Sequence, residues 1–242
     1  MIYDIGYSNK SRLRNAAMDA FQRADILIPN DRDLLYWKAS TPAACLCFNA
    51  VSQRPGDIMQ EIVRGELVAG IVGRDQMAEF NLRQDNPFNS LIELAELPGA
   101  RCWIKTGGCA DVFSESGPSL SSLNGKRVAA PKSSEKLIRQ LFAKAGVTPS
   151  RFLFRDGAVE GTVPRKLADA IVDLVETGGT MKANNLVPGE TLFQSDAVLV
   201  ARRDIASFIG DYSRVGPGVA DRAEFVQMFA GRVNAGARLQ AA

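Results

Sequence analysis

Residues 167–186 read Leu-Ala-Asp-Ala-Ile-Val-Asp-Leu-Val-Glu-Thr-Gly-Gly-Thr-Met-Lys-Ala-Asn-Asn-Leu. The run 170–175 is apolar except for Asp173, which is typical of a buried strand. Two adjacent glycines between threonines follow it and predict a turn, and a helix is expected to start near Met181. A buried strand that leads through a glycine turn into a helix is the repeating unit of α/β proteins.

The sequence on both sides of this stretch continues the alternation of strands and helices. Asp57 is positioned to cap a helix that Gly65 ends, and an apolar strand over 67–72 follows directly. Near the C-terminus, Asp221 and Glu224 have the spacing of a capping box, which predicts the start of the last helix. The chain is therefore predicted to have an α/β fold.

A segment rich in Gly, Ser and Pro, residues 106–125, divides the chain. Such a composition is typical of a loop or of a crossing between lobes. We expect lobe I to contain residues 1–104 and 192–242, and lobe II to contain residues 105–191. Two α/β lobes joined by two crossings would leave a cleft between them, and small ligands bind in such clefts.

The turn at 177–180 offers the chemistry of an anion-binding site. Its adjacent glycines let backbone N–H groups converge on an anion, and Thr177 and Thr180 add hydroxyl donors. Carboxylates do not help to bind a bare phosphate, so Asp173 and Glu176 point to a phosphorylated sugar. They would accept hydrogen bonds from its hydroxyls or lie near its bound Mg²⁺. The alternative is a plain glycine turn, because short glycine motifs are weak evidence on their own.

The composition excludes several classes of function. The chain has 29 Lys and Arg against 27 Asp and Glu, a net charge of +2, and no histidine. Without histidine there is no Ser-His-Asp or Cys-His triad and no His-ligated metal site. The near-neutral charge gives no basis for nucleic-acid binding. No stretch approaches the roughly 18 apolar residues of a membrane helix, and residues 1–15 have no apolar signal-peptide core, so a cytoplasmic location without membrane contact is expected.

Residues 167–186 closely resemble the signature of the ATP phosphoribosyltransferases, the family that begins histidine biosynthesis. Other segments match the family pattern in the same order, over about residues 2–201: 10–13, 54–58, 65–75, 123–129 and 157–160. The resemblance implies a two-lobed, periplasmic-binding-protein-like (type II) fold with the ligand cleft between the lobes. It also implies transfer of phosphoribosyl from phosphoribosyl pyrophosphate (PRPP) to N1 of ATP, which releases pyrophosphate. Mg²⁺ is expected as a cofactor carried by the substrate.

The resemblance implies two groups of site residues. The first group binds the phosphosugar: Asp169, Asp173, Glu176, Thr177, Gly178, Gly179 and Thr180. Its last four members would hold the 5′-phosphate, and its three carboxylates would bind the ribose hydroxyls. The second group faces the pyrophosphate: Lys10, Arg12, Arg32 and Arg54. Arg32 and Arg54 are the expected catalytic residues, because arginine stabilises the negative charge that develops on the leaving pyrophosphate.

The chain also departs from the family pattern. It has Ser11, Val68, Trp103 and Ala130 where the family has Gly, Asp, Arg and Thr. These changes spare the 177–180 turn, and they leave two alternatives open. One is a related phosphoribosyltransferase with a different acceptor, and the other is a cytoplasmic small-molecule-binding protein on the same fold.

The C-terminal end bears on the expected partners. The few residues after Ala201 are enough for one or two helices, which resembles the short form of the family. That form is a catalytic subunit, expected here as a homodimer or in a hetero-oligomer with a histidyl-tRNA-synthetase-like regulatory subunit.

Overall fold

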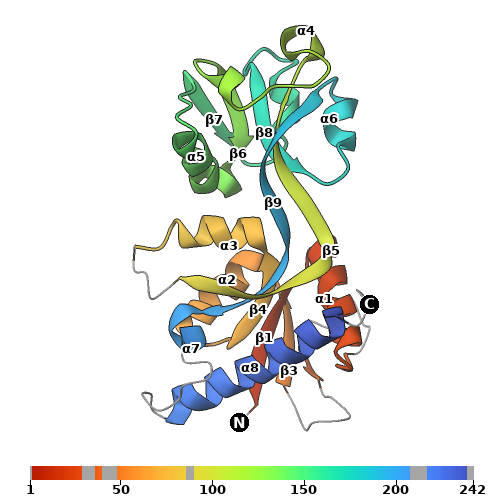
Figure 1. Ribbon diagram of the computed structural model, residues 1–242, viewed down its shortest axis with the longest axis vertical. Coiled ribbons are helices and arrows are strands. Elements are labelled where there is room, and N and C mark those ends of the chain that lie inside the picture. The colour runs from red at the N-terminus through yellow and green to blue at the C-terminus, as the bar shows by residue number, and fades with distance from the viewer. Residues whose placement is uncertain (1, 29–35, 40–47, 86–89, 208–216, 239–242) are drawn as a thin grey trace. The chain divides into compact units, whose positions relative to one another are not determined.

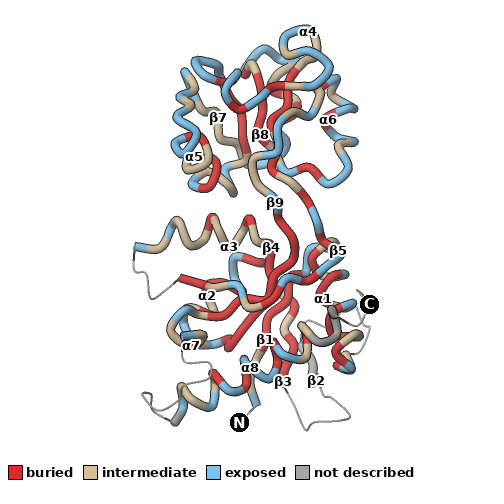
Figure 2. The backbone as a smooth tube through the Cα atoms, in the orientation of Figure 1, coloured by how far each residue is buried: buried red, intermediate tan, exposed pale blue. Residues whose placement is uncertain are grey.

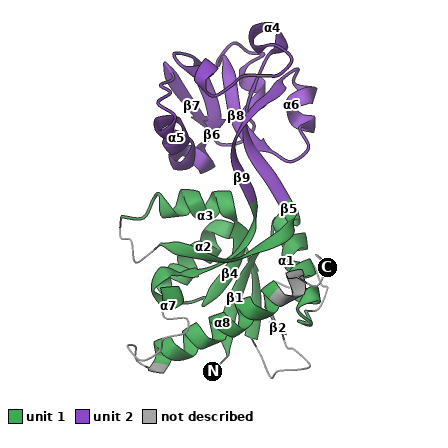
Figure 3. Ribbon diagram, in the orientation of Figure 1, with its two compact units in different colours: residues 1–100, 196–242 green, residues 101–195 purple. Residues whose placement is uncertain are grey.

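The computed structural model describes residues 2–28, 36–39, 48–85, 90–207 and 217–238 (Figure 1). Strands and helices alternate along the chain, so the predicted α/β class is confirmed. The chain forms two compact units (Figure 3). Unit 1 contains residues 1–100 and 196–242, and unit 2 contains residues 101–195. The crossings thus lie four residues from the expected positions at 104 and 192.

Unit 1 is built on a mixed sheet. Its elements are β1 (Tyr3–Ser8), α1 (Ser11–Arg23), β2 (Tyr36–Ala39), β3 (Phe48–Gln53), α2 (Pro55–Arg64), β4 (Ala69–Gly73), α3 (Arg74–Asn81), α7 (Arg203–Ser207) and α8 (Pro217–Arg238). Two long strands, β5 (Leu91–Gly108) and β9 (Val187–Arg202), run from one unit into the other. The sheet order here is β2-β3-β1-β4-β9, with β1 parallel to β3 and β4.

Different helices cover the two faces of this sheet (Figures 1 and 2). Helices α1 and α8 bury one face around a group of aromatic rings: Phe21, Phe48, Phe225 and Phe229. Helix α2 covers the other face with Ile58 and Ile62. On β4, Ile71 joins the first cluster and Val72 the second, because successive side chains of a strand point to opposite faces.

The ends of two helices differ in part from the predictions. Gly65 ends α2 in the left-handed conformation, as predicted, with φ of 80°. Arg54, rather than Asp57, is the N-cap of α2, because Pro55 has the fixed φ that suits the first helical position. Helix α8 likewise starts at Pro217, before the predicted start at Asp221.

The close contact between α2 and β4 depends on a glycine. A Cβ atom at Gly70 would lie 2.4 Å from Cγ2 of Ile58 and 3.1 Å from Cδ1 of Ile62. We therefore expect Gly70→Ala to lower the free energy of unfolding by about 1–3 kcal/mol, the usual cost of overpacking a core. Urea denaturation measures the change. The matched control is Gly56→Ala on α2, where a Cβ would meet nothing within 4 Å; equal stability of the two variants would contradict the expectation.

Unit 2 contains the predicted turn. Its elements are α4 (Ala110–Phe113), η2 (Ser121–Leu123), β6 (Arg127–Pro131), η3 (Lys132–Ser134), α5 (Glu135–Lys144), β7 (Arg151–Arg155), η4 (Glu160–Thr162), β8 (Ala170–Val175) and α6 (Gly179–Ala183). The strand order is β5-β8-β6-β7, with β6 parallel to both of its neighbours and β5 antiparallel to β8. Strand β8 has the predicted bounds, and α6 starts two residues before Met181. Among the described residues, no helix has the length and apolar character needed to cross a bilayer.

Candidate active site

The turn after β8 has the backbone geometry that the glycines were expected to allow. Gly178 has φ of 78° and ψ of 0°, a left-handed conformation that glycine adopts without steric cost. Met181, which is 2% exposed, packs with Val175 in the core of unit 2 and so holds the end of the turn against the core. Thr177, Gly179 and Thr180 are exposed, so their hydroxyl and N–H groups are available to a ligand.

A pocket of about 250 Å³ lies over this turn. Residues 174–181 line it together with Asp173 and Glu160. All of these residues belong to unit 2. The structure therefore brings together six of the predicted phosphosugar-binding residues: Asp173, Glu176, Thr177, Gly178, Gly179 and Thr180.

Glu160 is a lining residue that the sequence did not single out as part of the site. It is the first residue of η4, is 6% exposed, and has a buried Oε2 atom with no hydrogen-bond partner in the described structure. Buried glutamate is rare unless it is paired, so this oxygen is a candidate acceptor for a ligand. The one signal in the sequence was its place at the end of the 157–160 segment of the family pattern.

Asp173 projects from β8 into the same pocket. Its Oδ1 atom accepts a hydrogen bond of 2.7 Å from the N–H of Leu174. Burial raises the pKa of Asp173 to about 6, the Leu174 N–H opposes this shift, and the neighbouring Glu160 carboxyl adds to it. A carboxyl group with a pKa so far above its usual range is typical of a functional site.

The raised pKa makes the stability of the fold depend on pH. The folded state holds the Asp173 proton more tightly than the unfolded state does, so the stability that this proton contributes is lost as the pH rises from about 4 to about 6. We therefore expect Asp173→Asn to raise the melting temperature at pH 7.5 and to increase the free energy of unfolding by up to about 3 kcal/mol. At pH 5 both increases should be much smaller. Scanning calorimetry at both pH values tests this, and an equal effect at the two values would contradict it.

The structure separates Asp169 from the other predicted residues. Asp169 lies just before β8, four residues from Asp173, which is about 13 Å along a strand. Its carboxylate accepts hydrogen bonds from the backbone N–H and the guanidinium of Arg127, with an Nη2–Oδ1 distance of 2.6 Å. This pairing lowers the pKa of Asp169. Asp169 thus joins β8 to β6 at the end of the strand remote from the pocket.

The residues predicted to face the pyrophosphate belong to unit 1. Lys10 and Arg54 are the N-cap residues of α1 and α2, and both are exposed. The Arg12 guanidinium donates a hydrogen bond to the carbonyl of Ala100. Arg32 lies outside the described residues. The roles of these four residues stay predictions.

Of the four departures from the family pattern, Trp103 and Ala130 belong to unit 2, and Trp103 is the partner of a residue that lines the pocket. It pairs with Val175 across β5 and β8, at the end of β8 where the turn begins. The ammonium of Lys105 lies 5.9 Å from the centre of its ring. Val68 and Ala130 are buried in the cores of the two units, and Ser11 is the exposed first residue of α1.

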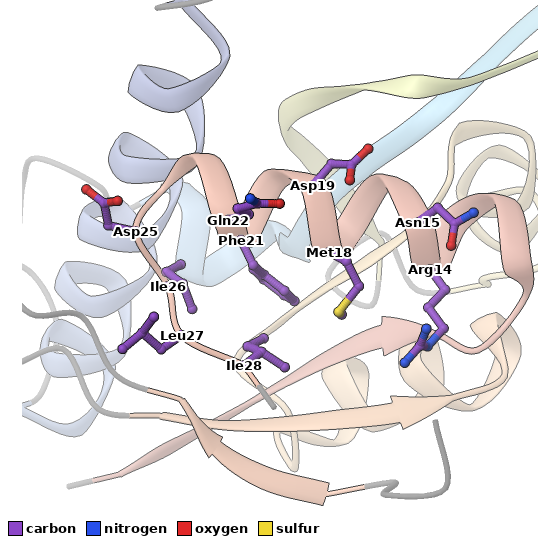
Figure 4. A pocket seen from close by; sticks show the side chains of 10 residues that line it. All are labelled: Arg14, Asn15, Met18, Asp19, Phe21, Gln22, Asp25, Ile26, Leu27 and Ile28. Carbon is purple, nitrogen blue, oxygen red and sulfur yellow. The ribbon is translucent and has the colours of Figure 1, made fainter. Parts of the chain in front are cut away.

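A larger pocket, of about 710 Å³, lies in unit 1 (Figure 4). It runs along α1 and the segment that follows it, and the side chains of Arg14, Met18, Phe21 and Ile28 are among those that line it. None of its described lining residues belongs to the predicted site. Six of the predicted phosphosugar-binding residues instead line the smaller pocket of unit 2.

The chain is similar to known proteins. The family model described as ATP phosphoribosyltransferase matches residues 54–211. An ATP phosphoribosyltransferase from Arthrobacter sp. (strain FB24) is 36% identical over 150 residues, which are 62% of this chain and 48% of that protein. One from Maricaulis maris (strain MCS10) is 32% identical over 199 residues, 82% of this chain and 64% of that protein. The chain thus spans about half the length of the first of these relatives.

A solved structure shows the same fold. The ATP phosphoribosyl transferase (HisG:HisZ) complex from Thermotoga maritima contains a chain with a TM-score of 0.61 and 20% sequence identity, and the match covers 96% of this chain and 99% of that one. The predicted resemblance and the periplasmic-binding-protein-like (type II) fold are confirmed. The family match covers the pocket, its acidic residues and the turn after β8, and the chain therefore belongs to the ATP phosphoribosyltransferase family.

Proposed function

We propose that this chain transfers the phosphoribosyl group of PRPP to N1 of the adenine ring of ATP and releases pyrophosphate, the first step of histidine biosynthesis. The observation that carries the proposal is the pocket over the turn 177–180, which combines an anion-binding loop with the carboxyl groups of Glu160, Asp173 and Glu176. Such a pocket suits a ligand that has a phosphate at one end and hydroxyls at the other.

In this proposal the residues of unit 2 bind and orient the sugar. The N–H groups of the turn and the hydroxyls of Thr177 and Thr180 hold the 5′-phosphate. Asp173 and Glu176 accept hydrogen bonds from the ribose hydroxyls. Their negative charge also stabilises the positive charge that develops on the ribose carbon as pyrophosphate leaves. N1 of adenine is already unprotonated near neutral pH, so no residue has to act as a strong base.

The pyrophosphate is assigned to cations of unit 1 and to Mg²⁺. Arg54 is exposed and has a guanidinium that suits bidentate binding of phosphate oxygens. Lys10, Arg12 and Arg32 complete this group. We assign Mg²⁺ to the oxygens of PRPP, which would bring it to the protein as part of the substrate.

The proposed reaction also suggests partners for this chain. The similar solved structure is of a HisG:HisZ complex. We propose that this chain likewise acts as a catalytic subunit, as a homodimer or with a histidyl-tRNA-synthetase-like regulatory subunit. A cytoplasmic location accords with the reaction, since PRPP and ATP are cytoplasmic metabolites.

The test is direct observation of the product. The purified chain is incubated with PRPP, ATP and Mg²⁺, with and without a regulatory subunit, and phosphoribosyl-ATP and pyrophosphate are measured by mass spectrometry and a pyrophosphate assay. Both products should appear together and should require PRPP. Saturable PRPP binding with no use of ATP would favour a different acceptor. No PRPP binding by a folded chain would overturn the proposal.

A further inference from the structure

Two half-buried side chains of β5 lie on the sheet face that carries the pocket of unit 2. Lys105 is the direct partner of Asp173, and Trp103 is the direct partner of Val175, across β5 and β8. Residues that pair in this way point to the same face of a sheet, with Cβ atoms about 5 Å apart. Asp173 and Val175 both line the pocket, so the side chains of Trp103 and Lys105 start beside it.

A glycine further along β5 gives the same orientation independently. Gly107 is two residues from Lys105, so a Cβ atom at Gly107 would point to the same face of the sheet. That atom would lie 3.0 Å from Sδ of Met181, the residue that directly follows the turn. Trp103 and Lys105 therefore point to the face against which Met181 packs.

The ammonium of Lys105 is available to a ligand. It lies 5.9 Å from the centre of the Trp103 ring, close to the limit of about 6 Å for attraction between a cation and an aromatic ring. Within residues 90–207, which the structure describes throughout, it forms no ion pair with a carboxylate. Because Trp103 pairs with Val175 at the end of β8, the ammonium lies toward the end of the strand where the turn begins.

The pocket needs positive charge if it is to bind a phosphate group. Its charged lining residues, among those that the structure describes, are all acidic: Glu160, Asp173 and Glu176. A phosphate monoester carries about two negative charges near neutral pH, and the N–H groups of the turn supply only partial positive charges. A full positive charge beside the pocket would therefore contribute strongly to phosphate binding.

We propose that Lys105 is a phosphate-binding residue of this pocket and that Trp103 is its positioning residue. In the free protein the ring of Trp103 holds the ammonium near the turn. When the phosphate of a ribose 5-phosphate group enters the turn, the ammonium leaves the ring and donates a hydrogen bond to a phosphate oxygen. This bond joins two charged groups and is stronger than a ring contact at the limit of its range. The inference rests on the proposed function, because it needs a phosphosugar in this pocket.

Isothermal titration calorimetry of the full chain with ribose 5-phosphate tests the role of Lys105. Lys105→Gln should weaken binding about ten- to hundredfold, the effect of one lost hydrogen bond to a charged group. Lys105→Arg keeps the charge and should recover most of the affinity, which a merely structural role would not predict. Because salt screens charges, added NaCl should weaken binding by the wild type more than binding by Lys105→Gln.

The matched control is Lys144→Gln. Lys144 is an exposed lysine of unit 2 in the last turn of α5, and it is not among the residues that line the pocket. This variant loses the same charge from the same unit, so it has the same net charge as Lys105→Gln. It should bind ribose 5-phosphate as the wild type does.

The movement away from Trp103 has a readout of its own. The chain has two tryptophans, and the other one, Trp37, lies on β2 of unit 1. Trp37→Phe leaves Trp103 as the only tryptophan, so its fluorescence reports the loss of the nearby ammonium. Ribose 5-phosphate should change this emission with the dissociation constant that calorimetry gives. Adding Lys105→Gln to this variant should make the change at saturation much smaller.

The outcomes separate the inference from the proposed function. Circular dichroism confirms that each variant folds, and Lys105→Met replaces Lys105→Gln if that variant does not. Equal affinity of the wild type and Lys105→Gln, an equal loss in Lys144→Gln, or the same fluorescence change without the ammonium would overturn the inference while the phosphosugar site stands. If the wild type binds neither ribose 5-phosphate nor PRPP at millimolar concentration, the proposed function falls together with the inference.

Discussion

Replacing Asp173 by Asn and Glu176 by Ala in one variant is expected to reduce phosphoribosyl transfer about 10²–10⁴-fold. In the proposed binding mode, the two changes remove two hydrogen bonds between ionised carboxylates and the ribose, each worth about 1.5–3 kcal/mol. They also remove negative charge beside the carbon that becomes cationic, so kcat should fall more than KM rises. Steady-state kinetics with PRPP as the varied substrate measure both constants.

The matched control for this experiment is Asp169→Asn. Asp169 has the same side chain and lies just before the same strand, but Arg127 already binds its carboxylate and it does not line the pocket. Its replacement should leave kcat and KM nearly unchanged and should lower only the stability of the β6–β8 pair. Unchanged turnover in the double variant, or an equal loss in the control, would remove Asp173 and Glu176 from the site.

Replacing Thr177 and Thr180 by Val is expected to weaken PRPP binding about 10²–10⁴-fold. Valine keeps the shape of threonine but lacks its hydroxyl. In the proposed binding mode, each change therefore removes a hydrogen bond to the charged 5′-phosphate, worth about 1.5–3 kcal/mol. The turn itself should persist, because its left-handed residue is Gly178 and its anchor is Met181. Calorimetric titration with PRPP and Mg²⁺ measures the dissociation constant.

Thr148→Val is the control for the hydroxyl deletion. Thr148 is an exposed threonine of the same unit whose recorded hydrogen bond to Asn124 uses its backbone N–H, and it lies outside the pocket. The control variant should bind PRPP as the wild type does. If the double variant also kept wild-type affinity, the hydroxyls of the turn would have no part in holding the phosphate. The alternative, a glycine turn that binds no anion, would then be favoured.

The parts of the site that follow one another in the chain could be predicted from the sequence. Strand β8, Asp173 at its fourth position, the left-handed Gly178 and helix α6 lie within one continuous stretch. The apolar run and the glycine pair dictate this geometry locally, so no distant contact is needed to specify it. The same local rules gave the end of α2 at Gly65 and failed at its start, where Pro55 overrode Asp57.

The sequence by itself thus determined the α/β class, the family and the glycine turn after β8. Only the tertiary structure decided which acidic residues face that turn. Asp169 and Asp173 look equivalent in the sequence, but a strand extends about 3.3 Å per residue and places them at opposite ends. Glu160 precedes Asp173 by a loop, and only the tertiary structure places both residues in the lining of one pocket. Side-chain pairing between distant segments is a property of the packed fold, and no local pattern in the chain encodes it.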